Sequence, residues 1–133
     1  MDIKDIYDIF KQYPTICTDT RLATKDSIFI SLKGEKFNGN EFALKSIEDG
    51  CAYAIVDEEE YDVNKHTIFV HDALKTLQDL ATYHRKQLNI PLIAITGTNG
   101  KTTSKELINA VLNSELSCIA TKGNLNNHIG VPL

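Results

Sequence analysis

The residues of this chain with the clearest chemical potential lie at positions 96–103, which read Thr-Gly-Thr-Asn-Gly-Lys-Thr-Thr. An apolar run at 92–95 precedes them and an amphipathic pattern follows, so the sequence predicts a strand, a glycine turn and a helix. Gly97 and Gly100 would let the backbone fold back until successive N–H groups point at one anion. The helix would present its free N–H groups and the positive end of its dipole to the same point. This layout predicts a phosphate-binding loop.

Two side chains complete the chemistry expected of such a loop. The Lys101 ammonium can reach the terminal phosphates of a nucleotide, and the Thr102 hydroxyl is placed to ligate Mg²⁺. The spacing departs from the common pattern GxxxxGK[ST], because Ile95 stands where its first glycine would be. This departure disfavours a generic kinase or GTPase. An ordinary turn between a strand and a helix is the alternative interpretation.

Size, composition and charge limit the classes of protein. The 133 residues are enough to bury a core, and no apolar run approaches the length of a membrane span. Cys17, Cys51 and Cys118 lie far apart without a CxxC pair, so we expect buried thiols in a reducing cytosol rather than disulfides or zinc. Residues 1–90 carry 16 acids and 11 bases, and residues 91–133 carry 2 and 3. Without a basic stripe we expect no binding to nucleic acid, whereas a local site for a phosphorylated small molecule is compatible.

Alternating strands and helices predict an α/β protein with a parallel sheet. Apolar periodicity predicts helices near residues 3–10, 41–49, 72–88 and after the loop, and strands at 28–32, 53–56, 67–70, 92–95 and 117–121. The helix after the loop is expected to bury its apolar face, formed by Leu107, Ile108, Val111 and Leu112.

Smaller signals have structural interpretations. Residues 33–34 predict a turn, and Gly50 predicts the C-terminal cap of the helix before it. The four acids at 57–60 predict a solvated turn rather than a metal site. His84 is interpreted as a packed histidine rather than a ligand.

The best division of the chain lies near residues 89–91, where Pro91 interrupts it. Residues 1–89 would form an α/β module, and residues 90–133 would open a nucleotide-binding sheet. The second part is too short to cover both faces of a parallel sheet, and it lacks a further strand that could carry an acid for Mg²⁺. We therefore expect the front end of a larger protein.

Two further loops could hold ligands. Asn124, Asn126 and Asn127 place three amides just beyond a predicted strand, where loops of an open α/β sheet line the ligand crevice. A plain turn is the alternative, since asparagine tolerates left-handed backbone. Residues 18–21 and 33–40 bracket the first predicted strand. Arg21 could bind a phosphate, although an Asp-x-Arg pair also forms local salt bridges.

Together these segments resemble the Mur ligases. Residues 96–103 are similar to the ATP loop of that family, which departs from the strict spacing in the same way. Residues 123–133 resemble the asparagine-containing segment of the members that add D-Ala-D-Ala, whereas the member that adds the third stem residue usually has threonines there. Residues 18–21 resemble the SDSR-like uridine-end motif, and residues 28–34 resemble the strand that follows it. Residues 37–42 match x-D-G-H-x-F, with asparagine in place of both Asp and His.

The resemblance implies a fold and an activity. The family has a UDP-binding first domain, an ATP-binding centre and a C-terminal domain, so residues 1–89 would be the UDP-sugar-binding domain and residues 90–133 the truncated start of the ATP-binding domain, with strand, loop, helix and strand. The complete enzyme would join D-Ala-D-Ala to UDP-MurNAc-tripeptide through an acyl phosphate, in peptidoglycan precursor synthesis. ATP and Mg²⁺ are the implied cofactors.

The resemblance also implies residue roles. Lys101 would act on the β- and γ-phosphates, Thr102 would hold Mg²⁺, and the ATP site would comprise Gly97, Thr98, Asn99, Gly100, Lys101, Thr102 and Thr103. Substrate contacts would come from Thr20, Arg21, Asn38, Gly39, Asn126 and Asn127.

Several alternatives stay open from the sequence. The chain could be a non-catalytic module that binds UDP or a nucleotide, or part of a related ligase that adds the third stem residue or makes folylpolyglutamate. We expect a cytoplasmic monomer without membrane contact. The 133 residues alone are expected to be inactive in ligation, because the family's modified lysine and metal-binding acid would lie beyond Leu133.

Overall fold

The computed structural model describes residues 1–121, 123, 125 and 127–133, with Leu22 described by its backbone only. Internal contacts divide the chain into two compact units, the first built on Met1–Gln87 and the second on Leu88–Val131. Each unit is described by itself below. In the described part of the chain, no helix is both long and apolar enough to cross a membrane.

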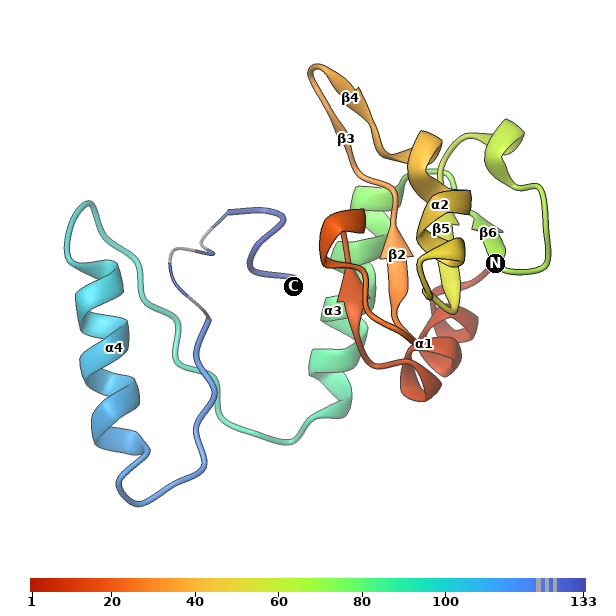
Figure 1. Cartoon of the computed structure of the whole chain (residues 1–133). Coiled ribbons are helices and arrows are strands. Elements are labelled where there is room, and N and C mark those ends of the chain that lie inside the picture. The colour runs from red at the N-terminus through yellow and green to blue at the C-terminus, as the bar shows by residue number, and fades with distance from the viewer. Residues whose placement is uncertain (122, 124, 126) are drawn as a thin grey trace. The chain divides into compact units, whose positions relative to one another are not determined.

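The first unit is built on a parallel sheet of four strands: β1 (Ile16–Cys17), β2 (Ile28–Ile30), β5 (Tyr53–Val56) and β6 (Thr67–Phe69), in the order β1-β2-β5-β6. Ile28 pairs with Tyr53, and Ala54 pairs with Thr67. Helix α2 (Ala43–Glu48) covers one face, and helices α1 (Ile3–Gln12) and α3 (Ala73–Gln87), which pack on each other, cover the other (Figure 1). The α/β class predicted from the sequence is confirmed.

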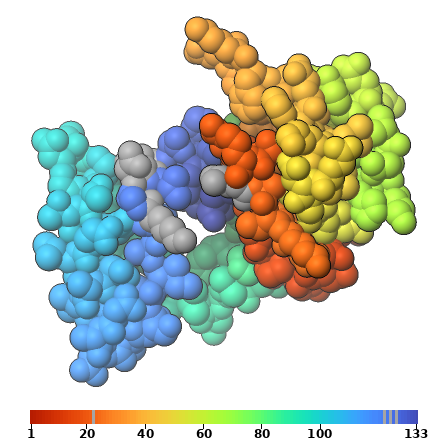
Figure 2. All heavy atoms as spheres, in the orientation of Figure 1, coloured from red at the N-terminus to blue at the C-terminus, as the bar shows by residue number. Residues whose placement is uncertain are grey.

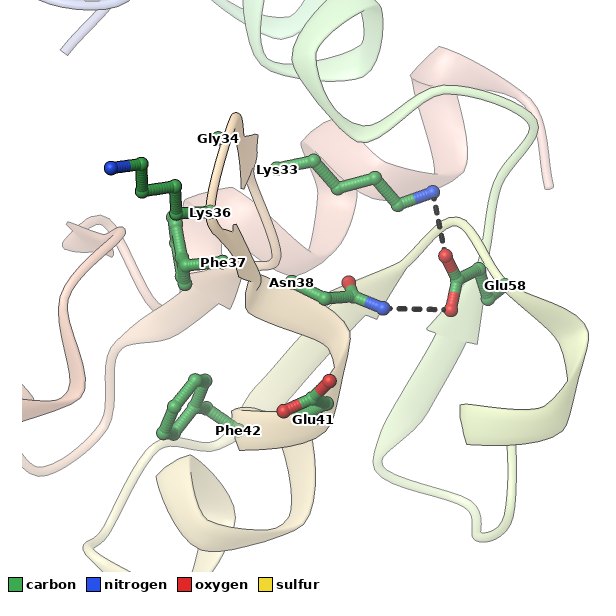
Figure 3. Close-up of a pocket in the computed structure, with 8 residues that line it drawn as sticks. All are labelled: Lys33, Gly34, Lys36, Phe37, Asn38, Glu41, Phe42 and Glu58. Atoms are coloured by element: carbon green, nitrogen blue, oxygen red, sulfur yellow. Dashed lines mark hydrogen bonds and ion pairs between the residues drawn. The ribbon is translucent and has the colours of Figure 1, made fainter.

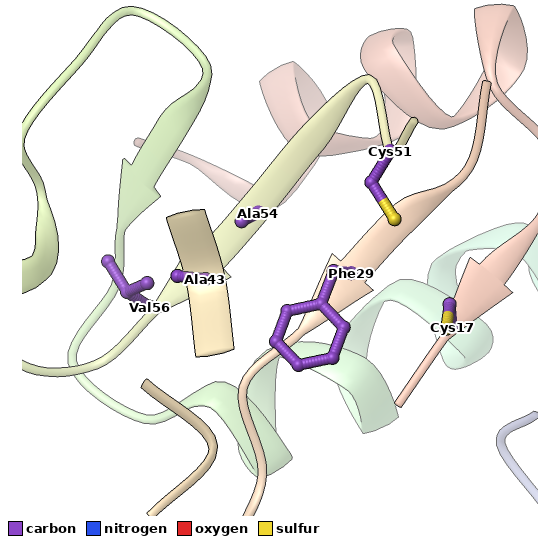
Figure 4. Packing of buried hydrophobic residues seen from close by; sticks show 6 residues of the cluster. All are labelled: Cys17, Phe29, Ala43, Cys51, Ala54 and Val56. Carbon is purple, nitrogen blue, oxygen red and sulfur yellow. The ribbon is translucent and has the colours of Figure 1, made fainter. Parts of the chain in front are cut away.

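Alternate strand residues fill the two sides of the sheet, because successive side chains of a strand point to opposite faces. Under α2, a buried cluster comprises Cys17, Phe29, Ala43, Cys51, Ala54 and Val56 (Figure 4). Ile28, Ile30 and Ile55 occupy the intervening positions and are at most 1% exposed. On the helices, Ile6 and Leu77 are 2% and 1% exposed. These strands are apolar on both faces, as expected for a sheet covered on both sides.

Local signals start and stop the helices. Asp2 caps α1 in a capping box with Asp5, and the Asp72 carboxylate accepts the Lys75 N–H at the start of α3. Gly50 follows α2 with φ +116°, so the predicted glycine cap is confirmed. The packed role of His84 is also confirmed: its Nδ1 lies 3.2 Å from the Tyr7 hydroxyl across the α1–α3 interface.

The prediction of a turn at residues 33–34 is wrong. These residues form strand β3 (Lys33–Gly34), which pairs antiparallel with β4 (Phe37–Asn38) in a hairpin that projects from the first unit (Figure 2). The turn lies at residues 35–36. The predicted helix at 41–49 begins as the 3₁₀ turn η2 (Gly39–Phe42), and two further 3₁₀ turns are η1 (Thr20–Leu22) and η3 (Glu59–Tyr61).

Among the described residues of the second unit, helix α4 (Lys101–Leu112) is the one regular element. The strands predicted at 92–95 and 117–121 are wrong for this structure, since both segments are irregular. A strand needs a hydrogen-bonded neighbour, and neither segment has one among the described residues. The predicted burial of the apolar face of α4 is also wrong: the described residues of the second unit form no sheet to cover it, and Leu107 and Val111 are 63% and 70% exposed.

Candidate functional site

The phosphate-loop candidate forms a tight bend before α4. Gly97 has φ +151° and Gly100 has φ +76°, conformations that favour glycine. Residues 98–100 are exposed, and α4 begins directly after Gly100. The prediction that both glycines allow the chain to fold back is therefore confirmed in the backbone.

The start of α4 has no side-chain cap within the described part of the chain. Helices α1 and α3 begin with the carboxylates of Asp2 and Asp72, which accept backbone N–H groups. Helix α4 has Gly100 in this position, and its first turn contains no acid. The first helical N–H groups are therefore left to solvent or to an external anion, and the helix dipole favours the anion.

Lys101 lies across this bend. Its ammonium donates to the Gly97 carbonyl at 2.5 Å, which closes a ring over residues 97–101. Thr102 and Thr103 follow on the exposed first turn of α4. The structure thus collects the residues predicted for the phosphate site in one segment: Gly97, Thr98, Asn99, Gly100, Lys101, Thr102 and Thr103.

The loop that contains Asn124, Asn126 and Asn127, called the asparagine loop below, is described in part. Asn126, for which we predicted substrate contact, lies outside the described residues. Asn127 turns its side-chain oxygen onto its own loop, where it accepts the N–H groups of Ile129 at 3.1 Å and Gly130 at 2.7 Å. This is a typical asparagine turn, so the Asn127 carbonyl group orders the loop itself. A role of Asn127 toward a ligand stays a prediction.

A second candidate site lies at one edge of the sheet in the first unit. All four strands are parallel, so their carboxyl ends meet at one edge, where α/β sheets usually bind ligands. Thr20 and Arg21 follow β1 there, Asn38 ends the hairpin after β2, and Gly39 begins η2. The topology therefore brings the predicted uridine-end residues to the same edge.

Arg21 is held by a local salt bridge. Its guanidinium contacts both carboxylate oxygens of Asp19, with Nη2 at 2.6 Å from Oδ2 and Nε at 2.9 Å from Oδ1. These bonds lower the pKa of Asp19 to about 2. The Arg21 side chain is nevertheless 87% exposed. The local salt bridge, one of the two interpretations of the Asp-x-Arg motif, is therefore present. A phosphate contact by Arg21 stays a prediction.

A cleft of about 510 Å³ opens beside the hairpin (Figure 3). It is lined by Lys33, Gly34, Lys36, Phe37, Asn38, Glu41, Phe42 and Glu58. The rings of Phe37 and Phe42 are 49% and 38% exposed, with centroids 6.3 Å apart. Exposed aromatic faces beside amide and ammonium groups suit a planar polar ligand. Of the predicted substrate residues, Asn38 lines this cleft, whereas Thr20, Arg21 and Gly39 are not in its lining.

Ion pairs and hydrogen bonds connect Lys33, Asn38 and Glu58, which line one side of the cleft. The Lys33 ammonium lies 2.9 Å from a carboxylate oxygen of Glu58, and the Asn38 amide donates to Glu58 at 2.9 Å (Figure 3). The same ammonium lies 2.9 Å from a carboxylate oxygen of Asp57. The lysine lowers the pKa of Glu58. The interpretation of residues 57–60 as a merely solvated turn is therefore wrong for its first two acids.

Beneath this wall lies a buried asparagine whose role the sequence did not reveal. Asn40 is 0% exposed and bridges the hairpin to the end of β5. Its amide donates to Asn38 Oδ1 at 2.9 Å and to Asp57 Oδ1 at 2.8 Å, and its oxygen accepts the Asp57 N–H at 3.0 Å. The one available signal was its place in the segment that resembles x-D-G-H-x-F.

Gly39 has a packing role. A Cβ at this position would lie 2.3 Å from the Leu32 carbonyl oxygen, and the Gly39 N–H donates to that oxygen at 3.0 Å. The backbone of η2 thus touches that of Ser31 and Leu32, just after β2, where only glycine fits. Ligand contact by Gly39 stays a prediction.

The structure offers little for a metal by itself. Among the described residues, no group of three or more histidine, cysteine or acidic side chains could hold an ion. Thr102 supplies one exposed hydroxyl at the phosphate loop. This fits Mg²⁺ only as one protein ligand beside phosphate oxygens and waters, a common arrangement for this ion.

Known proteins match this chain over most of its length. Residues 95–133 match the Mur ligase middle domain. The chain is 42% identical to UDP-N-acetylmuramoyl-tripeptide–D-alanyl-D-alanine ligase of Bacillus subtilis and 36% identical to that of Escherichia coli, in each case over 89% of this chain and 26% of the relative. The chain thus spans about a quarter of the length of these relatives.

Solved structures give the same result. A crystal structure of MurF from Acinetobacter baumannii matches with a TM-score of 0.82 at 31% identity, over 98% of this chain and 31% of that one. MurF from Thermotoga maritima, in complex with ADP, matches with a TM-score of 0.81 at 25% identity, over 94% of this chain and 29% of that one. The chain is therefore similar to Mur ligases over most of its own length. Within that family, the relatives described here are all MurF, the D-Ala-D-Ala-adding ligase.

Proposed function

We propose that this chain is part of an ATP-dependent ligase that joins D-Ala-D-Ala to UDP-MurNAc-tripeptide. Residues 1–89 would bind the UDP-sugar end of the acceptor, and residues 90–133 would open the ATP-binding domain. The names and structures of the relatives support this assignment, since the chain aligns with them over most of its length.

One observation carries the ATP part of the proposal: the uncapped start of α4 behind two glycines of positive φ. An anion at this point would receive the free N–H groups and the positive end of the helix dipole. Lys101 already bridges the bend through the Gly97 carbonyl. A phosphate oxygen could replace this neutral acceptor and form a stronger, charge-assisted bond.

We propose the following residue roles, which this geometry supports. Residues 97–100 would cradle the phosphates with their backbone, and Lys101 would neutralise charge on the β- and γ-phosphates. Thr98, Asn99 and Thr103 would complete the loop. Thr102 would be the protein ligand of Mg²⁺, which when bound offsets the charge of the phosphates.

The chemistry that these groups would serve is activation of a carboxylate. The terminal carboxylate of the tripeptide attacks the γ-phosphorus of ATP, a P–O bond breaks and ADP leaves. The amine of D-Ala-D-Ala then attacks the acyl carbon, the C–O bond breaks, phosphate leaves and the amine loses a proton. The first transfer needs mainly alignment and charge neutralisation, which the loop N–H groups and Lys101 can supply.

At the other end of the acceptor, the first unit would hold UDP. Thr20, Arg21, Asn38 and Gly39 lie at the carboxyl edge of the sheet. The cleft with Phe37 and Phe42 adds aromatic faces on which a base could stack. Asn126 and Asn127 would contact substrate or ATP phosphates from the second unit.

The remaining expectations concern the state of the protein. We propose a cytoplasmic monomer without nucleic-acid or membrane partners. The 133 residues alone would not catalyse ligation, because they span about a quarter of the length of the ligases that they resemble.

Calorimetry on this chain tests the proposal. Titration with UDP and, separately, with Mg-ATP should show binding of both, and Lys101→Ala should abolish the ATP heat while it leaves the UDP heat unchanged. Binding of UDP without ATP would favour a non-catalytic UDP-binding module. Binding of neither would refute the assignment of both sites, and amide formation by the chain alone would refute its inactivity.

A further inference from the structure

A second lysine on α4 ties the asparagine loop to the helix of the phosphate loop. Lys105 lies one helical turn after Lys101. Its ammonium donates to the carbonyl oxygens of Thr121 and Gly123, the latter at 3.0 Å. It also lies 2.9 Å from a carboxylate oxygen of Glu106.

These contacts occupy all the hydrogen-bond donors of the Lys105 ammonium. An ammonium has three N–H donors, and Lys105 directs them to three oxygen acceptors. Its side chain is only 15% exposed, whereas that of Glu106 is 59% exposed. A lysine is rarely this covered without partners, so the two carbonyl contacts account for its burial.

The Thr121 carbonyl ends a segment without regular structure. Residues 117–121 form no strand, so their backbone groups lack the ladder that usually satisfies them. Contacts to a charged donor are stronger than neutral hydrogen bonds. The Lys105 ammonium therefore links Thr121 and Gly123, which precede Asn127, to the helix that begins at the phosphate loop.

We propose that Lys105 is a positioning residue that holds the asparagine loop in register with the phosphate loop. The proposal rests on the proposed function, because it assigns both loops to one ligand site. Lys101 would touch the phosphates, and Lys105 would act through the loop that it fastens.

Hydrogen–deuterium exchange on this chain tests the tether without reference to activity. Lys105→Met keeps most of the side-chain length but removes the charge, and should speed exchange in the peptide from Thr121 to Leu133 by about tenfold. Lys105→Arg should restore protection, since a guanidinium can also donate to carbonyls. Glu106→Gln is the matched control and should change little, because exposed ion pairs contribute little. Unchanged exchange in Lys105→Met would overturn the proposal.

Kinetics of the complete ligase test the positioning role. Lys105→Met should lower kcat/KM for ATP by about tenfold, with the KM for D-Ala-D-Ala unchanged, and Lys105→Arg should recover most of it. If Lys105→Met exchanges faster but keeps the unsubstituted kcat/KM for ATP, Lys105 is not a positioning residue. If the unsubstituted protein fails to ligate, the proposed function is wrong, and the exchange result still decides whether Lys105 fastens the loop.

Discussion

Replacement of Asn40 by alanine should destabilise the first unit strongly. The substitution removes three side-chain hydrogen bonds in a place with no access to water, since Asn40 is 0% exposed. It leaves the Asp57 N–H without its acceptor and takes a donor from the Asp57 carboxylate. Asp57 would keep Lys33 as its remaining charged partner.

The magnitude follows from the kinds of bond. The neutral bonds to Asn38 and from the Asp57 N–H contribute about 1 kcal/mol each, and the bond to the Asp57 carboxylate about 2 kcal/mol. The expected loss is therefore about 4 kcal/mol, a large part of the roughly 5–13 kcal/mol typical of a unit of this size. Asn64 is the matched control, because it is exposed and its side-chain oxygen accepts one bond, from the His66 N–H. Asn64→Ala should cost about 1 kcal/mol or less.

Tyrosine fluorescence during urea unfolding measures this loss selectively. The chain has five tyrosines and no tryptophan, and all five tyrosines precede residue 88. The signal thus reports the first unit and is blind to the second. A loss below about 1.5 kcal/mol for Asn40→Ala, with an unchanged m-value, would show that the network does not hold the hairpin.

Four further predictions use the same unfolding assay or calorimetry. Gly39→Ala should cost at least about 3 kcal/mol, because its Cβ would overlap the Leu32 carbonyl; a loss below about 1 kcal/mol would contradict this. Ser31→Ala should stabilise by about 1 kcal/mol, because the Ser31 hydroxyl, among the described residues, is buried without a partner; destabilisation would contradict it. Burial raises the pKa of Asp57, but hydrogen bonds outweigh burial and leave the pKa below its usual value. The stabilisation by Asp57 should therefore be complete above about pH 4 and be lost as pH falls through the lowered pKa. Asp57→Asn should make the urea midpoint fall less between about pH 5 and pH 2.5, and an equal fall in both proteins would contradict this. Gly100→Ala should weaken Mg-ATP binding about tenfold, because φ +76° costs a side chain about 1–2 kcal/mol; unchanged affinity would contradict the loop assignment.

Several features could be predicted from the sequence because their causes are local. The glycines at 97 and 100 adopt the positive φ expected of them, and Gly50 ends its helix as predicted. The central strand β5 spans the predicted residues, since a short apolar run bounded by turn signals is sufficient for a buried strand. The phosphate-loop candidate needed no more than residues that are adjacent in the chain.

Other features depended on contacts between distant positions. Asn40 meets Asp57 across 17 residues, and Lys105 meets the Thr121 carbonyl across 16. Contacts between such remote positions leave no periodic pattern in the sequence. The sequence therefore predicted neither the hydrogen bonds of Asn40 under the cleft nor the contacts of Lys105 on α4. The strand predicted at 92–95 is absent from that described segment. The composition of this segment favours a strand, but a strand forms only when a second strand pairs with it.

The sequence by itself thus determined which glycines adopt positive φ beside a helix end, which stretches are helical and which residues could meet a phosphate. Only the tertiary structure decided which acids and amides hold the hairpin, which lysine fixes the asparagine loop, and which apolar faces are covered. The physical reason is that φ and ψ preferences and helix caps act between neighbours in the chain, whereas burial, ion pairing and strand pairing are satisfied only when remote segments come together.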